Sequence, residues 1–358
     1  MTRPLLTLLT LSLAACAVEA PLPGAEPATA TAPLVVDQGG QMQGGQMQGG
    51  QMQGGQMQGE LLGGESGSRE VPLAHAYEGM TLEGSALESV RIEHGALVAE
   101  RTVVLHGKSP SPSSSLTTRE TLRGVQLVGA ELQAYTGAGA ALRHRIAEVV
   151  PEAGDADTFL YRLEQQNADG TWSTWCAADA AGTALALPVA AVFDEGGNRH
   201  ESTTRFTFGC TSGAIAKCYR WGYKPWLPHP ASATVMRELH WACTRMARAD
   251  YCGDGTPHTR DGTLINLWDT LSAPGPIQQH GEPMAGMLFE AGWSPRGAVC
   301  LSKQRWLTLS PDVAAACPER LIAPGLATGE ATVCENPTEA QAFSADVQLF
   351  NESQLNAL

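Results

Sequence analysis

Apolar residues recur at every fifth position through much of the N-terminal half of the chain. Between residues 38 and 64 the unit Gln-Met-Gln-Gly-Gly repeats, with its methionines in strict register at Met42, Met47, Met52 and Met57. The same phase returns as Leu or Ile at Leu82, Leu87, Ile92 and Leu97, and again at Leu122, Leu127 and Leu132. The pattern therefore predicts a Gly-rich repeat segment followed by a second segment, residues 70–140, with degenerate five-residue repeats.

The five-residue period resembles that of pentapeptide-repeat proteins, whose right-handed square β-helix points one side chain per unit inward. That family prefers a small residue two positions before the central one, whereas this chain has Met80, Val90 and Glu120 there. For residues 38–64 we therefore expect a flexible linker rather than a folded coil. For residues 70–140 we expect a β-rich segment, and two forms stay open: short or irregular β structure, or a degenerate β-helix.

The evenly spaced methionines allow one further interpretation, because thioether sulfurs bind Cu(I). No His or Cys lies among them. We therefore favour a linker over a copper site.

The second half of the chain predicts a mixture of short strands and one main helix. Thr158–Gln165 and Thr171–Cys176 flank the turn sequence Asn167–Gly170, which is typical of an antiparallel hairpin. Over Ser232–Arg248 apolar residues recur at helical spacing. We expect an α+β fold: a small disulfide-rich domain of short antiparallel strands and one main helix over residues 141–340, then a loosely ordered tail over residues 341–358.

The N-terminal residues are typical of an export signal. Arg3 gives the N-terminal region a positive charge. The apolar run Leu5–Leu13 that follows is much shorter than the roughly 20 residues that cross a bilayer. The run ends in Leu-Ala-Ala-Cys at Cys16, which resembles the lipobox of bacterial lipoproteins. The resemblance implies a lipoprotein signal peptide over residues 1–15 and a lipid anchor on Cys16.

The residue after Cys16 bears on location. It is Ala17, not the Asp that commonly retains such lipoproteins at the inner membrane, so we expect an outer-membrane anchor. Residues 16–37 are rich in Pro and Ala and predict an extended tether. The expected partner is thus a membrane, reached through the lipid on Cys16.

Charge excludes one class of partner. The chain has 23 Lys and Arg against 37 Asp and Glu, a net charge of −14, which disfavours binding to nucleic acid.

The cysteines beyond Cys16 number eight, and all lie in the second half: Cys176, Cys210, Cys218, Cys243, Cys252, Cys300, Cys317 and Cys334. In an exported chain an even number of cysteines indicates disulfides, here up to four. No two lie at the close spacing of a zinc knuckle, so a zinc site is the weaker interpretation. Nearness in sequence suggests that Cys317 pairs with Cys334.

The most specific motif is Cys243–Gly255, which reads Cys-Thr-Arg-Met-Ala-Arg-Ala-Asp-Tyr-Cys-Gly-Asp-Gly. It closely resembles the signature of the ADYC-domain family of bacterial exported proteins. The match extends upstream over Ala216–Trp226 and downstream over Phe289–Trp293 and Gly297–Cys300, so the resemblance covers roughly residues 160–306. The family carries no assigned biochemical activity, so the resemblance implies architecture and export rather than a reaction.

Polar residues gather in and after this motif. Asp254, His258 and Asp261 could form a hydrolytic site in which His258 is a general base, and Asp250, Asp254 and Asp261 could bind Ca²⁺. The spacing follows no known calcium loop, and no Gly-x-Ser-x-Gly motif supplies a nucleophile. We favour a structural interpretation, in which Arg248 and Asp250 form an ion pair at the end of the helix.

Tryptophan is concentrated in the same region, at Trp221, Trp226, Trp241, Trp268, Trp293 and Trp306. These rings could bind an envelope glycan, but more often such rings complete a small core. We therefore expect a cell-envelope lipoprotein that binds or scaffolds a glycan or protein partner without catalysis and without a cofactor. The alternative is a secreted-type hydrolase that uses Asp254, His258 and Asp261, with or without calcium.

Overall fold

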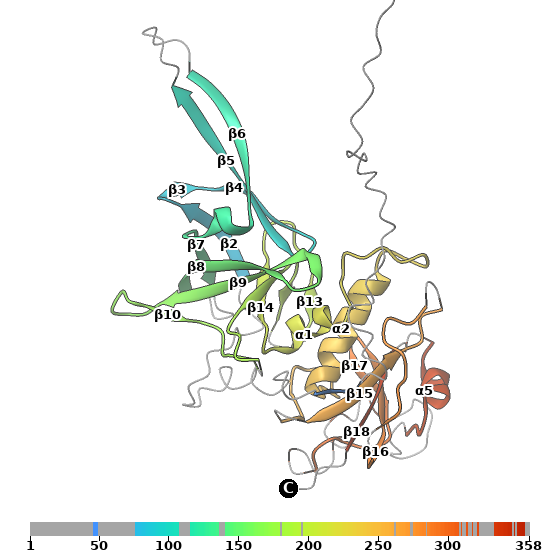
Figure 1. The fold of residues 1–358 in the computed structure, drawn as a ribbon. Coiled ribbons are helices and arrows are strands. Elements are labelled where there is room, and N and C mark those ends of the chain that lie inside the picture. The colour runs from blue at the N-terminus through green and yellow to red at the C-terminus, as the bar shows by residue number, and fades with distance from the viewer. Residues whose placement is uncertain are drawn as a thin grey trace, which may run out of the picture. The chain divides into compact units, whose positions relative to one another are not determined.

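Antiparallel strands make up most of the regular secondary structure in the part of the chain that the computed structural model describes (Figure 1). The described residues are 46–48, 76–106, 115–135, 140–179, 181–194, 196–260, 263–272, 275–283, 285–307, 333–345 and 349–354, with 309, 313, 317, 321 and 347. The predicted signal peptide, the tether, Cys16, Asp261 and most of the repeat lie outside them. Among the described residues no helix is both long enough and apolar enough to span a bilayer.

The largest sheet has eight strands, in the order β14-β11-β9-β8-β7-β2-β3, with β10 paired to β9. Their bounds are β2 (Ala76–Leu82), β3 (Ser85–Ala86), β7 (Glu131–Tyr135), β8 (Ala141–Glu152), β9 (Asp155–Gln166), β10 (Trp172–Thr174), β11 (Ala186–Val189) and β14 (Thr207–Cys210). The predicted hairpin is confirmed as β9 and β10. Its turn closes through a 2.9 Å hydrogen bond from the amide of Gly170 to the carbonyl of Asn167.

A three-stranded sheet of β4 (Glu88–Glu93), β5 (Ala96–His106) and β6 (Ser115–Arg123) accompanies it, and β12 (Val192–Phe193) pairs with β13 (Arg199–His200). These strands decide between the two forms left open for residues 70–140. β5 folds back on β6 in continuous antiparallel register, whereas a β-helix stacks its strands in parallel. The described part of this segment is antiparallel β structure and not a β-helix, and its strands are longer than expected, since β5 has 11 residues.

The five-residue pattern nevertheless marks the core of these sheets. Leu82, Leu87 and Leu97 are buried, and so are Leu122, Leu127 and Leu132. They belong to one cluster with rings such as Tyr77, Tyr161 and Phe208. The pattern therefore predicted which side chains are buried, although it did not predict how the strands pair.

The C-terminal half contains a five-stranded sheet in the order β1-β15-β18-β16-β17. Its bounds are β1 (Gln46–Gln48), β15 (Leu264–Asp269), β16 (Met287–Ser294), β17 (Gly297–Leu301) and β18 (Leu349–Gln354). The prediction of a loosely ordered tail is wrong for β18, which lies between β15 and β16 with Leu349 and Phe350 fully buried. β18 supplies the central strand of the sheet, so its backbone groups are paired on both sides.

Three α-helices occur in the described chain: α1 (Ala214–Arg220), α2 (Val235–Arg248) and α5 (Pro337–Phe343). The longest, α2, matches the predicted main helix but begins three residues later. Ser232 accepts a hydrogen bond from the amide of Thr234 and so shapes the turn before the helix. The buried face of α2 carries Leu239, Ala242, Cys243 and Met246, as its spacing predicted.

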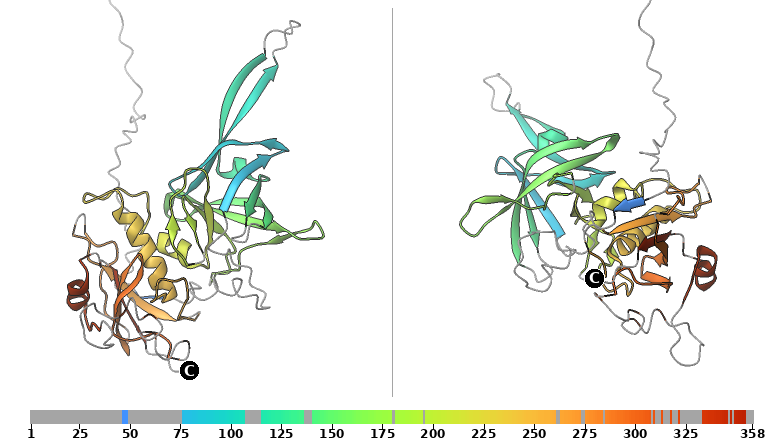
Figure 2. Two further views of the ribbon diagram at one scale, coloured as in Figure 1. Left: turned by 180° about the vertical axis from the view of Figure 1, so that it is seen from behind. Right: turned by 60° about the horizontal axis from the view of Figure 1, so that its bottom comes forward.

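The core of the C-terminal half lies around α2. Side chains of α1 and α2 share one apolar cluster with β11 and with Ile265, Trp293 and Leu349 of the five-stranded sheet. Figure 2 shows α2 beside the strands of this sheet. A second cluster, which includes Phe350 and Ala340, joins that sheet to α5. The described fold is thus the expected α+β class, with more strand than the sequence suggested.

Four disulfides join the eight cysteines, as predicted: Cys176–Cys210, Cys218–Cys243, Cys252–Cys317 and Cys300–Cys334. The suggested pair Cys317–Cys334 is wrong. Cys317 instead bonds to the motif after α2, and Cys334 bonds to β17, because the fold brings distant segments to each of them. No sulfur of the eight is left to bind zinc.

Candidate functional site

The part of the motif Cys243–Gly255 that follows α2 begins at Ala249, whose backbone is in the left-handed region. Ala249 has φ +50°, and its amide donates to the carbonyls of Arg245 and Met246. The amide of Asp250 then donates to the same Arg245 carbonyl at 2.9 Å. This turn closes the helix and sends the chain back over its last turn, which carries the Asp250 side chain towards the helix.

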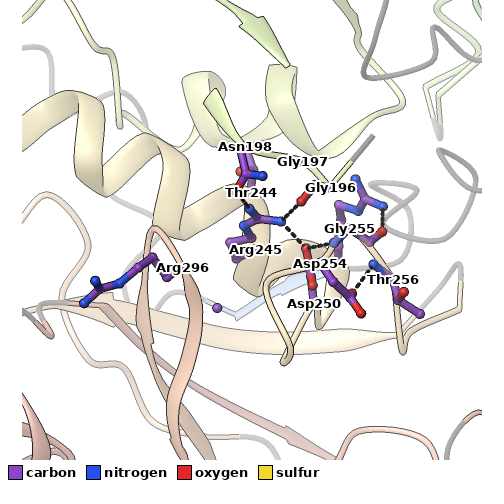
Figure 3. Close-up of polar contacts among 12 residues, drawn as sticks. Gly196, Gly197, Asn198, Thr244, Arg245, Asp250, Asp254, Gly255, Thr256 and Arg296 are labelled. Atoms are coloured by element: carbon purple, nitrogen blue, oxygen red, sulfur yellow. Dashed lines mark hydrogen bonds and ion pairs between the residues drawn. The ribbon is translucent and has the colours of Figure 1, made fainter. Parts of the chain in front are cut away.

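Asp250 forms its ion pair with Arg245, not with Arg248 as we expected (Figure 3). Both side chains are almost fully buried, at 2% and 1% exposed. Arg245 also donates to the carbonyls of Gly196 and Pro295 and to the side chain of Asn198. Because the chain reverses at Ala249, Asp250 meets the arginine five residues before it.

Arg248 binds the end of the loop that follows α2, residues 250–255. Its guanidinium donates to the carbonyl of Gly255, and the amide of Gly255 donates to the Asp250 carboxylate at 3.0 Å. Residues 250–255 are thereby closed into a loop whose polar groups face one another, and the two arginines of the motif have structural partners.

Tyr251 connects the motif to a second buried ion pair. Its hydroxyl donates to Glu290 at 3.1 Å and accepts the backbone amide of Arg305 at 2.8 Å. Its ring stacks on Trp293 at a centroid distance of 5.4 Å. Burial raises the pKa of Tyr251 well above its ordinary value, so the phenol stays protonated.

Glu290 and Arg305 are both fully buried and bond through both carboxylate oxygens, at 2.9 and 3.0 Å. Burial alone would raise the pKa of Glu290, but the charges of Arg305 and Lys303 outweigh it and hold the pKa below its ordinary value. Arg305 also donates to the carbonyls of Met246 and Ala247 at 3.0 and 3.3 Å. Arg305 therefore bonds to backbone carbonyls in the last turn of α2, where a cation is favourable.

The remaining motif residues are constrained by packing. Cys252 is bonded to Cys317, and Gly253 has φ +70°. A Cβ at Gly253 would lie 1.8 Å from the carbonyl oxygen of Arg296, a distance that no side chain allows. Glycine is required there by both the backbone angle and the close approach.

Two residues of the expected hydrolytic site, Asp254 and His258, are described, and each has a separate structural role. Asp254 is exposed and accepts the amide of Thr256 at 2.8 Å, which is an ordinary turn. His258 is buried; its Nδ1 donates to the carbonyl of Ala249 at 3.1 Å, and its amide donates to that of Arg248. Asp261 lies outside the described residues.

The expected calcium ligands are likewise separated by their roles. One oxygen of Asp250 accepts from both Arg245 and Gly255, whereas Asp254 faces solvent. In the part of the chain that the structure describes, no three His, Cys, Asp or Glu side chains are grouped to hold a metal ion.

The cavity beside this cluster is about the size of one water molecule. Its lining is formed by Gly197, Ala214, Ile215, Thr244, Arg245, Arg248 and Asp250. A space of that size does not admit an organic substrate.

Half of the clustered tryptophans belong to the core. Trp221, Trp268 and Trp293 are buried. Trp226, Trp241 and Trp306 are half-buried, and Trp241 donates to the carbonyl of Gly197 while Trp306 donates to Thr263. The core interpretation is therefore confirmed for the first three.

Sequence reasoning missed Glu290 and Arg305. The available signal was a single carboxylate inside the apolar stretch Met287–Trp293, since a charge in a buried strand requires a partner. Nothing in the sequence indicated which cation supplied it.

Comparison with known proteins gives one match. The family model described as the ADYC domain matches residues 124–307, a little more than half of the chain. The match begins before the residues that carry the resemblance and includes β7 and β8. No curated protein and no solved structure matches the chain.

Proposed function

The chain belongs to the ADYC-domain family, and from that premise we propose that it is a lipid-anchored cell-envelope protein that binds or scaffolds without catalysis. One observation carries the second half of this proposal. Arg245, Arg248, Asp250 and Tyr251 of the family signature bond to buried protein groups, and the cavity beside them is about the size of one water molecule.

The proposal that the protein is exported rests on its four disulfides and on its N-terminal sequence. Four disulfides are typical of a protein that matures in an oxidising compartment. The sequence Leu-Ala-Ala-Cys at Cys16 supplies the acceptor for a diacylglycerol, and several acyl chains on one residue anchor stably. The partner that we propose is an envelope glycan or an envelope protein.

Lipidation is tested by expressing the full chain in a bacterium that has an outer membrane, with an alkyne-labelled fatty acid in the medium. We expect the native chain to incorporate the label and to fractionate with the outer membrane. The Cys16→Ser variant should incorporate none. Equal labelling of the two chains, or none in either, contradicts the proposal.

The absence of catalysis is tested by presenting the purified, oxidised chain with ester, peptide and glycoside substrates. We expect no turnover above that of the buffer. An activity that disappears in Asp254→Asn while the melting temperature is unchanged would establish the hydrolase alternative, because Asp254 is exposed and its loss does not disturb the core.

Binding to glycan is tested by cosedimentation of the same chain with isolated cell-wall glycan. A bound fraction that saturates with chain concentration supports a glycan partner. Its absence, with the chain folded, directs the proposal to a protein partner.

A further inference from the structure

One backbone edge of β15, in the five-stranded sheet, is paired with a short strand of the repeat segment. β1 pairs antiparallel with β15, placing Gln46 opposite Asn266, Met47 opposite Ile265 and Gln48 opposite Leu264. The blue strand β1 is visible in the right-hand view of Figure 2. The other side of β15 is paired to β18. The repeat therefore covers an edge that would otherwise present unpaired amides and carbonyls.

The rest of that strand is held by the chain that follows it. The amide of Asp269 donates to the carbonyl of Gln278 at 3.0 Å, and the Asp269 carboxylate accepts the amides of Ile277 and Gln278. The side chain of Asn266 donates to the carbonyl of Gly281 at 3.1 Å. The segment from Ile277 to Gly281 thus contacts β15 from its middle to its end, and β1 takes Leu264–Asn266.

The length that remains matches the repeat. β1 is three residues long, which is the Gln-Met-Gln unit, and glycines bound it on both sides. Glycine weakens a strand interior, so the Gln-Met-Gln unit is the part of each repeat that is suited to strand pairing. The sequence contains four copies of this tripeptide: 41–43, 46–48, 51–53 and 56–58.

We propose that the β15 edge at Leu264–Asn266 is a docking site for the Gln-Met-Gln tripeptide and that any of its four copies can occupy it. Strand addition recognises mainly the backbone, and the four copies offer the same backbone and the same side chains. The docked population is the sum over the copies, up to four times that of a single copy. Because the tripeptide and the β15 edge belong to the same chain, the tripeptide is present at a high effective concentration. A strand of only three residues requires this, since it makes few hydrogen bonds.

Exchange between copies changes the length of chain between Cys16 and the sheet. Each step moves the docking point by five residues, about 17 Å of extended chain. The repeat would then set how far the domain reaches from its anchor. This consequence rests on the proposed lipidation of Cys16, whereas docking itself does not.

Hydrogen exchange at the amides of residues 264–266 in the purified full-length chain tests the proposal. The first variant has three prolines in place of Gln46–Gln48, and the second has them in all four copies, because proline removes the amide donors that a strand needs. The matched control places proline at Gly44, Gly49, Gly54 and Gly59, outside every tripeptide.

We expect the native chain and the control to show slower exchange at these amides than the four-copy variant. The single-copy variant should keep about three quarters of that difference, as expected for one of four equal sites lost. A single-copy variant that exchanges like the four-copy variant overturns interchange. A native chain that exchanges like the four-copy variant overturns docking, whatever the state of Cys16. Protection that rises with protein concentration assigns the strand to a second molecule and overturns docking within one chain.

Discussion

Asp250 and Arg245 form a buried ion pair across the end of α2, where the chain reverses at Ala249. The same arginine bonds to two loop carbonyls and to Asn198, so one guanidinium joins the helix to two other segments. The tetrapeptide Ala-Asp-Tyr-Cys at residues 249–252, part of the family signature, therefore stabilises the fold. Its removal should be measured as lost stability.

Arg245→Met should lower the free energy of unfolding by about 3–5 kcal/mol, because it leaves the carboxylate of Asp250 buried without its cation. Urea denaturation followed by circular dichroism measures the change. Arg143→Met is the matched control. Its pair with Glu131 is exposed, so we expect a loss below about 1 kcal/mol. Similar losses in the two variants would contradict the structural role of the buried pair.

Gly253→Ala and Gly84→Ala separate a steric clash from backbone strain. The two glycines have similar angles, φ +70° and +78°, but a Cβ at Gly84 meets nothing within 4 Å. Gly84→Ala should cost about 1–2 kcal/mol for the left-handed angle alone. Gly253→Ala should cost about 1–3 kcal/mol more, because its Cβ meets the Arg296 carbonyl. Thermal unfolding of both variants gives the comparison, and equal costs would remove the clash as an explanation.

Phe350→Ala tests the structural role of β18. Phe350 is fully buried, so its truncation should cost about 3–5 kcal/mol. Phe343→Ala, at a ring that is 43% exposed on α5, should cost less than about 1 kcal/mol. Denaturant midpoints of the two variants measure the difference. A small loss of unfolding free energy in Phe350→Ala would support the prediction of a loosely ordered tail.

His240 should make the protein less stable in mild acid. Burial, and then the charge of Arg199, lowers its pKa to about 3. The unfolded chain binds this proton near its ordinary pKa of about 6.5, so between these values the unfolded state holds more protons and stability falls as pH falls. From pH 8 to pH 5 we expect a loss of about 2 kcal/mol from this group.

His240→Gln keeps a donor for the carbonyl of Ile215 and cannot ionise, so its stability should change less over that range. Denaturation curves at pH 8, 6.5 and 5 give the slopes. A native slope retained in His240→Gln would show that other groups cause the acid sensitivity.

Calcium should not stabilise the protein through the motif. Asp250 is committed to Arg245 and Asp254 to a turn. We expect excess Ca²⁺ to leave the melting temperature of the native chain unchanged, and Asp254→Asn to lie within about 0.5 kcal/mol of it. An increase in melting temperature with Ca²⁺ that Asp254→Asn abolishes would establish a calcium site at this loop.

Local patterns predicted several elements well. The helical spacing after Ser232 placed α2 to within three residues of its start, and Gly170 placed the turn of the β9–β10 hairpin. These elements depend on interactions between residues that are close in sequence. β18 could not be placed in this way, since its partners Leu267 and Gly292 lie far from Asn351 and Phe350 along the chain.

The candidate site shows the same division. Charge and spacing singled out Asp250 and Arg248, but only the left-handed turn at Ala249 decided that Arg245 is the ionic partner. Nearness in sequence suggested His258 and Asp254 only for the alternative hydrolytic site. In the fold, the His258 ring is buried against a backbone carbonyl and the Asp254 side chain is exposed.

By itself the sequence determined the family, the number of disulfides, the main helix and the apolar positions of the five-residue pattern. The tertiary structure decided which cysteines pair, which strand completes the C-terminal sheet, and that the signature residues stabilise the fold. The physical reason is range. Periodicity and turn chemistry act between neighbours in the chain, whereas disulfide pairing, strand order and burial of charge depend on segments that meet only after folding.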